Sequence, residues 1–465
     1  MAFSQAFDLV VIGSGPAGLH AATHAARGGL RVALCEQRRE VGGACVHHGT
    51  IPSKALRERA VRRVLGGGLS AVEASVSVAD LIGEVGDVVA AHDRYMSRQL
   101  ERSGVTVIHG RARFRDPHTL EVRSPGGGTG SLTAARVVVA TGSVPRRLPH
   151  IAVDHEHVYD SDSVLSLAYL PRSLVVLGGG VVACEYASVF ALLGVRVTLV
   201  DRSAAPLGFL EPALVDRFVE RFVAMGGEFV GGASVTGTRF DGVSGVVTEL
   251  ADGRALCSDK VLCALGRVAQ VAGLDLEHAG VTLNDRGLVA VNEHGQTAVP
   301  HVYAAGDVVG PPALASASME QGRRAACHML GTDPGSGSRF LPTGIYAVPE
   351  LASVGMTEAE ARLAGDGVVT GMASFEEVAR AHIADAQDGF LKLIVGGDGR
   401  LLGVHACGAQ ATELVHMGQM ALIHGADVSV FIDNVFNFPT YGEAFRIAAL
   451  DAVGRIAQGA AVSAG

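Results

Sequence analysis

The sequence predicts an α/β fold with two domains built on parallel sheets, followed by a C-terminal α+β domain. At roughly 150 residues per domain, 465 residues suggest about three domains. A strand, a glycine-rich turn, a helix, a second strand and a carboxylate follow one another twice in the chain. From about residue 340, expected strands at 391–395 and 402–406 alternate with expected helices at 411–424 and 441–456.

The composition excludes several classes of protein. Apolar residues make up 48% of the chain, which is enough for buried cores, and the net charge of −9 argues against a nucleic-acid or polybasic membrane contact. No apolar run approaches the length of about 18 residues that crosses a bilayer. Since the chain runs directly into the first expected strand, we expect no signal peptide. The seven cysteines are scattered without a CxxC pair, so we expect no metal site and a cytoplasmic location.

The first glycine motif follows an expected strand at 8–12. Gly13 allows the turn, Gly15 lets a pyrophosphate approach the backbone, and Gly18 lets helix and strand pack closely. A helix to about residue 27 and a strand at 31–34 follow, and the helix start faces the phosphates. Glu36 lies 23 residues after Gly13, where a carboxylate can bind ribose hydroxyls. The segment predicts a Rossmann-like dinucleotide site.

The second motif repeats this arrangement. An expected strand at 174–177 leads into Gly178, Gly180 and Ala183, and a helix and a strand at 196–200 follow. Asp201 again lies 23 residues after the first glycine. Two independent dinucleotide sites are typical of a flavin enzyme that also takes a nicotinamide.

Asp201 and Arg202 bear on the choice between nicotinamide cofactors. A carboxylate accepts hydrogen bonds from a free ribose 2′-hydroxyl and repels a 2′-phosphate, whereas a guanidinium can pair with that phosphate. The two neighbours are compatible with binding NAD and NADP in turn. Arg202 is equally compatible with a solvated surface charge.

Between and after the two motifs, short strands alternate with turns. Strands are expected at 105–108 and 120–122, with a hairpin tip at 125–130. Three further strands, which end in small-residue turns or on a carboxylate, are expected at 137–143, 261–266 and 301–307. A helix is expected from about 315 to 328. Helical periodicity covers about 55–102.

The stretch 42–54 has two glycines, Cys45, Thr50 and Lys54. It resembles the active-site helix of the FAD-dependent pyridine nucleotide–disulfide oxidoreductases, and the resemblance extends over nearly the whole chain. Within that family, the chain is most similar to the soluble FAD-containing pyridine nucleotide transhydrogenases. The segments on which the two resemblances rest are 49–57, 140–142, 303–307, 314–317, 436–440 and 439–443.

Two departures from the disulfide reductases occur together. The family's two redox cysteines lie five positions apart, and here Thr50 takes the place of the second, so Cys45 has no partner. Phe438 occupies the place of the family's catalytic histidine, whose orienting glutamate is matched by Glu443. Since phenylalanine has no titratable proton, the dithiol half-reaction is lost and the nicotinamide half-reaction remains.

The resemblance implies four segments and a homodimer. These are the first part of an FAD-binding domain (1–150), an NAD(P)-binding domain (151–270), the second part of the FAD-binding domain (271–339) and a C-terminal dimerisation domain (340–465).

The resemblance also implies roles for individual residues. Lys54 lies near flavin N5 and pairs with Glu185, so that the pair positions the nicotinamide and stabilises negative charge on the flavin. Asp307 bonds a ribityl hydroxyl, and the helix after it directs its dipole at the flavin. The other positions expected at the cofactors are Gly43, Cys45, Ala112, Thr141, Gly142, Ser143, Gly266 and Ala315.

Cys45 and its neighbours leave alternatives open. A thiol at a helix start can have a lowered pKa and cycle through sulfenic acid, but Cys45 matches the outer cysteine of the family pair, which favours a packing role. The adjacent His47 and His48 are compatible with a metal site or a proton relay. Because no third ligand is apparent in the sequence, ordinary hydrogen bonding is favoured for both.

The predicted activity is ping-pong hydride transfer from NADPH to NAD⁺ through FAD, without a redox disulfide. One alternative is an NAD(P)H diaphorase or quinone reductase that shares every cofactor motif. The other is a flavin-binding scaffold or redox sensor without turnover.

Overall fold

The computed structural model describes residues 4–67, 78–337 and 339–463. Its first sheet has the strand order β3-β2-β1-β6-β5-β4, and β17 pairs with β6. The sheet therefore combines residues from before the second motif with residues from after it. Its strands are β1 (Ser4–Ile12), β2 (Val32–Glu36), β3 (Thr106–His109), β4 (Arg111–Asp116), β5 (Thr119–Arg123), β6 (Thr129–Val139) and β17 (Val302–Ala304).

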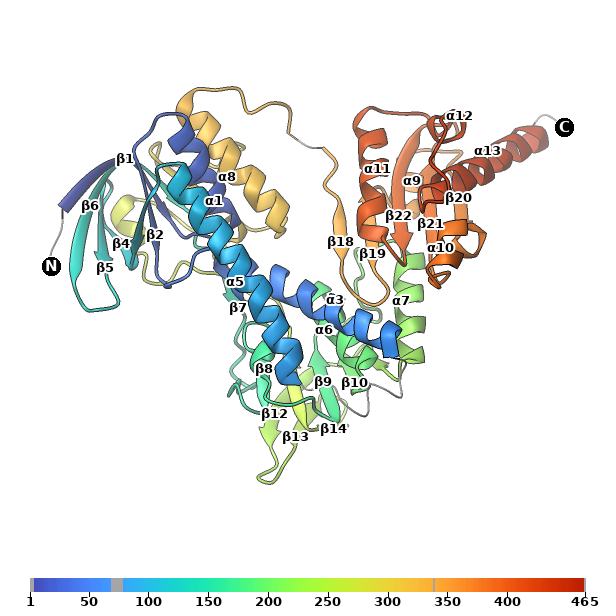
Figure 1. Ribbon diagram of the computed structural model, residues 1–465, viewed down its shortest axis with the longest axis horizontal. Helices are drawn as coiled ribbons and strands as arrows, with labels where there is room; N and C mark the ends of the chain where they lie inside the picture. The colour runs from blue at the N-terminus through green and yellow to red at the C-terminus, as the bar shows by residue number, and fades with distance from the viewer. Residues whose placement is uncertain (1–3, 68–77, 338, 464–465) are drawn as a thin grey trace.

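Helices α1 (Pro16–Arg27) and α8 (Ala315–Leu330) pack side by side against this sheet, next to α5 (Val78–Arg102) (Figure 1). Between β2 and α5 the chain forms α2 (Gly43–His47) and α3 (Thr50–Gly67). Because α3 packs against α5 and also against α6 (Val181–Leu192) of the second sheet, it connects the two halves of the molecule.

The second sheet has the order β11-β10-β9-β15-β8, and all of its pairs are parallel. Its strands are β8 (Val158–Asp160), β9 (Ser173–Leu177), β10 (Arg196–Val200), β11 (Glu228–Val230) and β15 (Lys260–Cys263), accompanied by α7 (Pro212–Ala224). Two small antiparallel sheets complete this half of the molecule: β12 (Val235–Phe240), β13 (Val246–Leu250) and β14 (Ala255–Ser258) in one, β7 (Ser143–Pro145) and β16 (Arg267–Ala269) in the other.

The C-terminal sheet is antiparallel, in the order β18-β19-β22-β21-β20. Helix α11 packs against β19 and β22, and α13 packs against β20 and β21. The elements are β18 (Thr343–Ile345), β19 (Leu351–Gly355), α9 (Glu358–Ala364), β20 (Val369–Ser374), α10 (Ala379–Ile383), β21 (Phe390–Val395), β22 (Leu401–Cys407), α11 (Ala411–Ile423), α12 (Val430–Asp433) and α13 (Glu443–Ser463).

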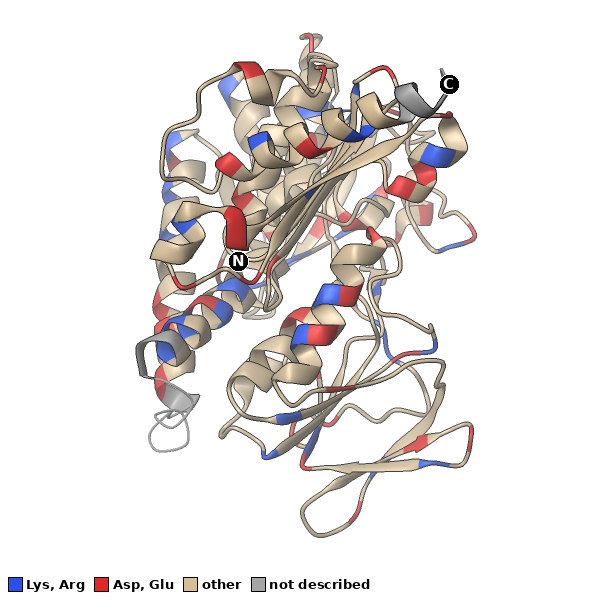
Figure 2. Ribbon diagram, turned by 90° about the vertical axis from the view of Figure 1, so that its right-hand side faces the viewer, with Lys and Arg blue, Asp and Glu red and all other residues tan. Residues whose placement is uncertain are grey.

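Buried apolar side chains fill the space between sheets and helices. Charged residues lie mainly on helices and loops, while the long strands at the centre of Figure 2 have few. The central strands β1 and β6 are parallel, and the last residues of both are buried apolar side chains, as expected for strands covered on two faces. No helix in the described ranges combines the length and apolarity needed to cross a membrane.

Most expected elements are present, with shifted ends. The strand expected at 31–34 is β2, which ends on Glu36 itself, and the hairpin tip at 125–130 is confirmed by the bond from Ser124 N to Gly128 O. The sequence reasoning missed the strands β4, β7, β8, β11–β14, β16 and β18–β20, and the helices α7, α9, α10 and α12. Part of the helical segment expected at 55–102 lies outside the described residues.

Gly322 of α8 gives a testable prediction about the packing of α1 on α8. A Cβ added at Gly322 would lie 2.1 Å from the carbonyl oxygen of Ala17 in α1, so the two helix backbones are in direct contact there. We expect Gly322→Val to cost about 1–3 kcal/mol by overpacking and to lower the midpoint of thermal unfolding. Gly83→Ala in α5 is the control, because a Cβ there meets nothing within 4 Å. Equal midpoints for the two variants would contradict the packing argument.

Candidate functional site

A cavity of about 1110 Å³ lies between the first sheet, the second sheet and the C-terminal section. Its walls come from the turn after β1, helices α2, α3 and α6, the turn after β6, and the start of α8. The predicted site residues that line it are Gly13, Gly15, Glu36, Gly43, Cys45, Lys54, Ala112, Thr141, Gly142, Ser143, Glu185, Asp307 and Ala315.

The first glycine turn is open towards this cavity. Gly13 has φ +104°, and a Cβ on it would lie 2.4 Å from the carbonyl oxygen of Ala140. A Cβ on Gly18 would lie 1.9 Å from the carbonyl oxygen of Gly13, whereas one on Gly15 would meet nothing within 4 Å. Gly13 and Gly18 are therefore required by the fold. Gly15 leaves its backbone accessible at the start of α1, and this cradle fits the pyrophosphate of the expected FAD.

Glu36 is buried at the end of β2. One carboxylate oxygen accepts hydrogen bonds from Ser14 N (3.0 Å) and Ser14 Oγ (2.6 Å), and the other accepts one from Arg38 N (2.9 Å). These bonds hold the carboxylate at the cavity wall, the place predicted for an adenosine ribose.

Lys54 and Glu185 form the expected ion pair, with Lys54 Nζ 2.6 Å from Glu185 Oε2. The second oxygen of Glu185 accepts a hydrogen bond from Tyr346 N at 2.9 Å, and Lys54 Nζ lies 5.1 Å from the centre of the Tyr346 ring. The Glu185 side chain is only 6% exposed, while that of Lys54 is 26% exposed. The ammonium group therefore faces the cavity from a position fixed by the carboxylate and the ring.

Cys45 is half-buried in α2, and Thr50 lies beside its thiol. Of the two alternatives left open for Cys45, the structure supports the packing role and not a thiol with a lowered pKa. Burial raises the pKa of the Cys45 thiol, and this effect outweighs the opposing effects of Thr50 and Lys54. All seven cysteines are free, so no disulfide lies in or near the cavity.

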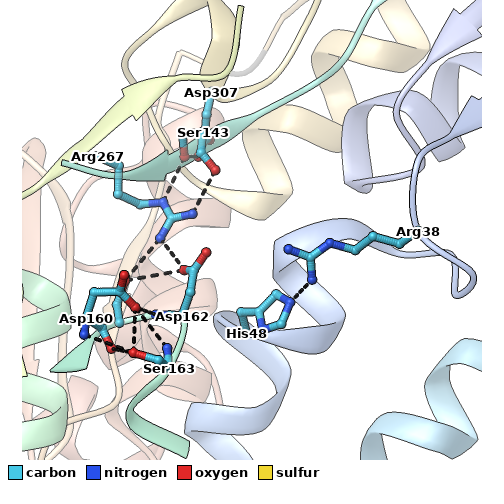
Figure 3. Close-up of polar contacts among 9 residues, drawn as sticks. Arg38, His48, Ser143, Asp160, Asp162, Ser163, Arg267 and Asp307 are labelled. Carbon is cyan, nitrogen blue, oxygen red and sulfur yellow. Dashed lines mark hydrogen bonds and ion pairs between the residues drawn. The ribbon is translucent and has the colours of Figure 1, made fainter. Parts of the chain in front are cut away.

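The two histidines after Cys45 make ordinary hydrogen bonds. His47 Nε2 lies 2.7 Å from Val41 O, and Arg38 donates to His48 Nε2 (Figure 3). Burial, followed by the charge of Arg38, lowers the pKa of His48. The described part of the chain holds no cluster of three or more side chains suited to a metal.

Asp307 lies in a polar cluster that contains an arginine missed by the sequence reasoning (Figure 3). Ser143 Oγ donates to Asp307 Oδ2 at 2.6 Å, and Arg267 Nε donates to Ser143 Oγ at 2.8 Å. Arg267 also pairs with Asp162, 2.8 Å away. Its position directly after Gly266, in a turn already singled out, was the only signal in the sequence.

Four of the predicted residues lie at turns: Gly43, Thr141 and Gly142 line the cavity, and Gly266 directly precedes Arg267, which also lines it. Gly43 (φ +61°) packs against the first glycine turn, since a Cβ there would lie 2.9 Å from Gly15 Cα. Gly142 and Gly266 have φ of +69° and +93°, which favours glycine at both positions. The Thr141 hydroxyl has no hydrogen-bond partner within the described residues.

The second glycine turn repeats the geometry of the first. Gly178 has φ +111°, and its Cβ would lie 2.5 Å from the carbonyl oxygen of Ala264, while a Cβ on Gly180 would meet nothing within 4 Å. Ala183, at the third position of the motif, is fully buried. This turn is separate from the cavity wall formed by the first.

Asp201 follows β10 and accepts two backbone hydrogen bonds, from Gly179 N and Ser203 N, each at 2.6 Å. Its carboxylate is thus anchored in the same way as that of Glu36. Arg202 is exposed and has no ion-pair partner in the described ranges. The structure brings Asp201 to the second glycine turn but does not attach Arg202 to it.

Phe438 lies in the segment between α12 and α13, outside the cavity wall, and is 68% exposed. Val435 in the same segment is 95% exposed.

Comparisons with known proteins agree with this architecture. Residues 7–322 match the pyridine nucleotide-disulphide oxidoreductase family, and residues 341–449 match its dimerisation domain. The chain is 41% identical over 458 residues to the soluble pyridine nucleotide transhydrogenase of Mycobacterium tuberculosis, covering 97% of this chain and 98% of that protein. It is 38% identical over 467 residues to the protein of that name in Pseudomonas putida, covering 97% and 99%.

Two solved structures have the same fold. The HOCl-induced flavoprotein disulfide reductase RclA from Escherichia coli gives a TM-score of 0.87 at 27% identity over 95% of this chain and 99% of that one. LpdA from Mycobacterium tuberculosis gives 0.88 at 26% identity over 96% and 99%. From these matches in sequence and fold, we conclude that the chain belongs to the pyridine nucleotide-disulphide oxidoreductase family.

Proposed function

We propose that this protein transfers hydride from NADPH to NAD⁺ through FAD in a ping-pong reaction. The observation that supports this most directly is the Lys54–Glu185 ion pair in a cavity where Thr50, and not a second cysteine, contacts Cys45. Relatives at 38–41% identity over nearly the full chain are named soluble pyridine nucleotide transhydrogenases, which supports the same reaction.

The cavity has the parts needed to hold FAD. The Gly15 turn at the start of α1 would take the pyrophosphate, Glu36 the adenosine ribose, and Asp307 the ribityl chain. When bound, FAD supplies a centre that accepts a hydride and gives it up again. Protein side chains supply binding, orientation and charge.

Lys54 is proposed to stabilise negative charge at the hydride-transfer centre. Its ammonium group is fixed by Glu185 and by the Tyr346 ring, so little reorganisation is needed during the reaction. Glu185 lies on α6, the helix that follows the second glycine turn. The pair therefore connects the nicotinamide-binding half of the molecule with the flavin side, and it can order an incoming nicotinamide ring.

The assembly, the domain layout and the location complete the proposal. The match to a dimerisation domain supports a homodimer, with the interface in residues 340–465. We place the FAD-binding parts at 1–150 and 271–339 and the NAD(P)-binding domain at 151–270, and we expect a cytoplasmic location.

Anaerobic rapid mixing tests the proposed function. NADPH should bleach the bound flavin, and NAD⁺ added afterwards should restore its absorbance within the turnover time. A quinone that restores the absorbance much faster than NAD⁺ would favour a diaphorase. Absence of bleaching by either nicotinamide would favour a binding protein without turnover, and efficient dithiol formation from a disulfide would overturn the proposal.

Lys54→Met is expected to slow the bleaching of bound flavin by NADPH by about a hundredfold, because it removes a preorganised positive charge. Lys260→Met is a matched control: this lysine also lies over a tyrosine ring, with Nζ 5.2 Å from the centre of Tyr169, but outside the cavity. Stopped-flow absorbance at the flavin band measures both rates. An unchanged rate in Lys54→Met would remove Lys54 from the mechanism.

Asp201→Ala is expected to weaken NADH binding about tenfold and to change NADPH binding much less, because the variant loses an acceptor for the 2′-hydroxyl together with a charge that repels a 2′-phosphate. Asp241→Ala is the control: Asp241 also accepts backbone hydrogen bonds, from Val243 and Ser244, but lies in the β12–β13 turn. Steady-state KM values for the two cofactors provide the measurement. Parallel changes for both cofactors would refute the role.

A further inference from the structure

The guanidinium group of Arg267 is held on two sides at the cavity wall (Figure 3). On one side it donates to the Ser143 side chain and to the Ser143 carbonyl oxygen, each at 2.8 Å. On the other side it donates to Asp162 Oδ1 at 2.8 Å and to Ser161 Oγ at 3.1 Å. Only 26% of its side chain is exposed. The fixed fork of a guanidinium group suits this bridging geometry better than a lysine would.

These contacts determine where the Ser143 hydroxyl directs its hydrogen. A guanidinium group has only donors, and a hydroxyl has one hydrogen. Since Ser143 Oγ accepts from Arg267, its own hydrogen is available for Asp307 Oδ2, which lies 2.6 Å away. This distance is typical of a hydroxyl that donates to an ionised carboxylate. The other carboxylate oxygen of Asp307 has no hydrogen-bond partner among the described residues, and Asp307 lines the cavity.

The opposite side of Arg267 rests on a rigid turn. Asp160 Oδ1 accepts hydrogen bonds from the backbone N–H groups of Asp162 and Ser163, both at 3.0 Å, and from Ser163 Oγ at 2.8 Å. This turn follows β8 of the second sheet, whereas Ser143 follows the last long strand of the first sheet. Arg267 thus connects the two sheets at the point where Asp307 faces the cavity.

We propose that Arg267 is a positioning residue for bound FAD. It fixes the Ser143 hydrogen on one oxygen of Asp307 and leaves the other oxygen to accept a hydrogen bond from a ribityl hydroxyl. This inference rests on the proposed function, in which FAD occupies the cavity.

FAD binding to the apoprotein, followed by flavin fluorescence, tests the proposal with Arg267→Met, Ser143→Ala and the double variant. Each single variant should bind FAD about tenfold more weakly, as expected for the loss of one charge-assisted contact. Because Arg267 acts through Ser143, the double variant should bind no more weakly than Ser143→Ala. Arg113→Met is the control: Arg113 pairs with Glu121 and Asp275 outside the cavity, and FAD affinity should not change.

Thermal unfolding with and without FAD distinguishes a positioning role of Arg267 from a purely stabilising one. In Arg267→Met the rise in melting temperature on adding FAD should shrink, because it follows the affinity of the folded protein for its ligand. If Arg267→Met melts at a lower temperature both with and without FAD but keeps its FAD affinity, the proposal is overturned. It is also overturned if the loss of FAD affinity in the double variant equals the product of the losses in the two single variants. If Arg267→Met does not fold, Arg267→Gln takes its place, with the same expected direction and the same overturning outcome. A wild-type protein that binds no FAD would instead overturn the proposed function.

Discussion

One buried carboxylate, that of Glu185, brings three parts of the chain to the same point. It belongs to α6 of the second sheet, its first partner Lys54 belongs to α3, and its second partner is the backbone N–H of Tyr346 in the C-terminal section. A carboxylate that is 6% exposed needs such partners, because burying a charge without them is costly. Buried ion pairs often add little net stability, since desolvation offsets their attraction. The placement of Lys54 at the cavity is therefore better explained by chemistry than by stability.

The two glycine turns have the same close backbone contact and the same hydrogen bond to an acid. In each, the first glycine lies against a carbonyl oxygen of a neighbouring strand end, Ala140 in one case and Ala264 in the other. In each, the acid at the end of the next strand binds the N–H of the residue after that glycine, as Glu36 does with Ser14 and Asp201 with Gly179. The two sequence motifs therefore form the same hydrogen bond. This shared bond explains why the acid follows the first glycine at the same spacing in each motif.

The features that were predictable from sequence are those fixed by local spacing. The two motifs, the helices after them and the residues of the Lys54–Glu185 pair follow from short patterns and from family likeness. Strands β7 and β16 have three residues each, too few for a periodic signal, and they were missed. Arg267 and Ser143 lie 124 residues apart, so their contact depends on tertiary structure alone. The sequence left the pKa of the Cys45 thiol open for a similar reason, since the burial that raises it depends on tertiary structure and outweighs the local effect of a helix start.

The protonation of the Cys45 thiol limits the reactions that the cavity can support. A thiol whose pKa is raised by burial is protonated near neutral pH, and the thiol form is a poor nucleophile. The residue that contacts it, Thr50, can hydrogen-bond but cannot form a disulfide or take electrons. Electrons delivered to a flavin in this cavity therefore have no sulfur acceptor beside it. In the proposed reaction, a second nicotinamide bound at the Asp201 turn is then the acceptor. One site used in turn by two dinucleotides is the simplest arrangement that these residues support.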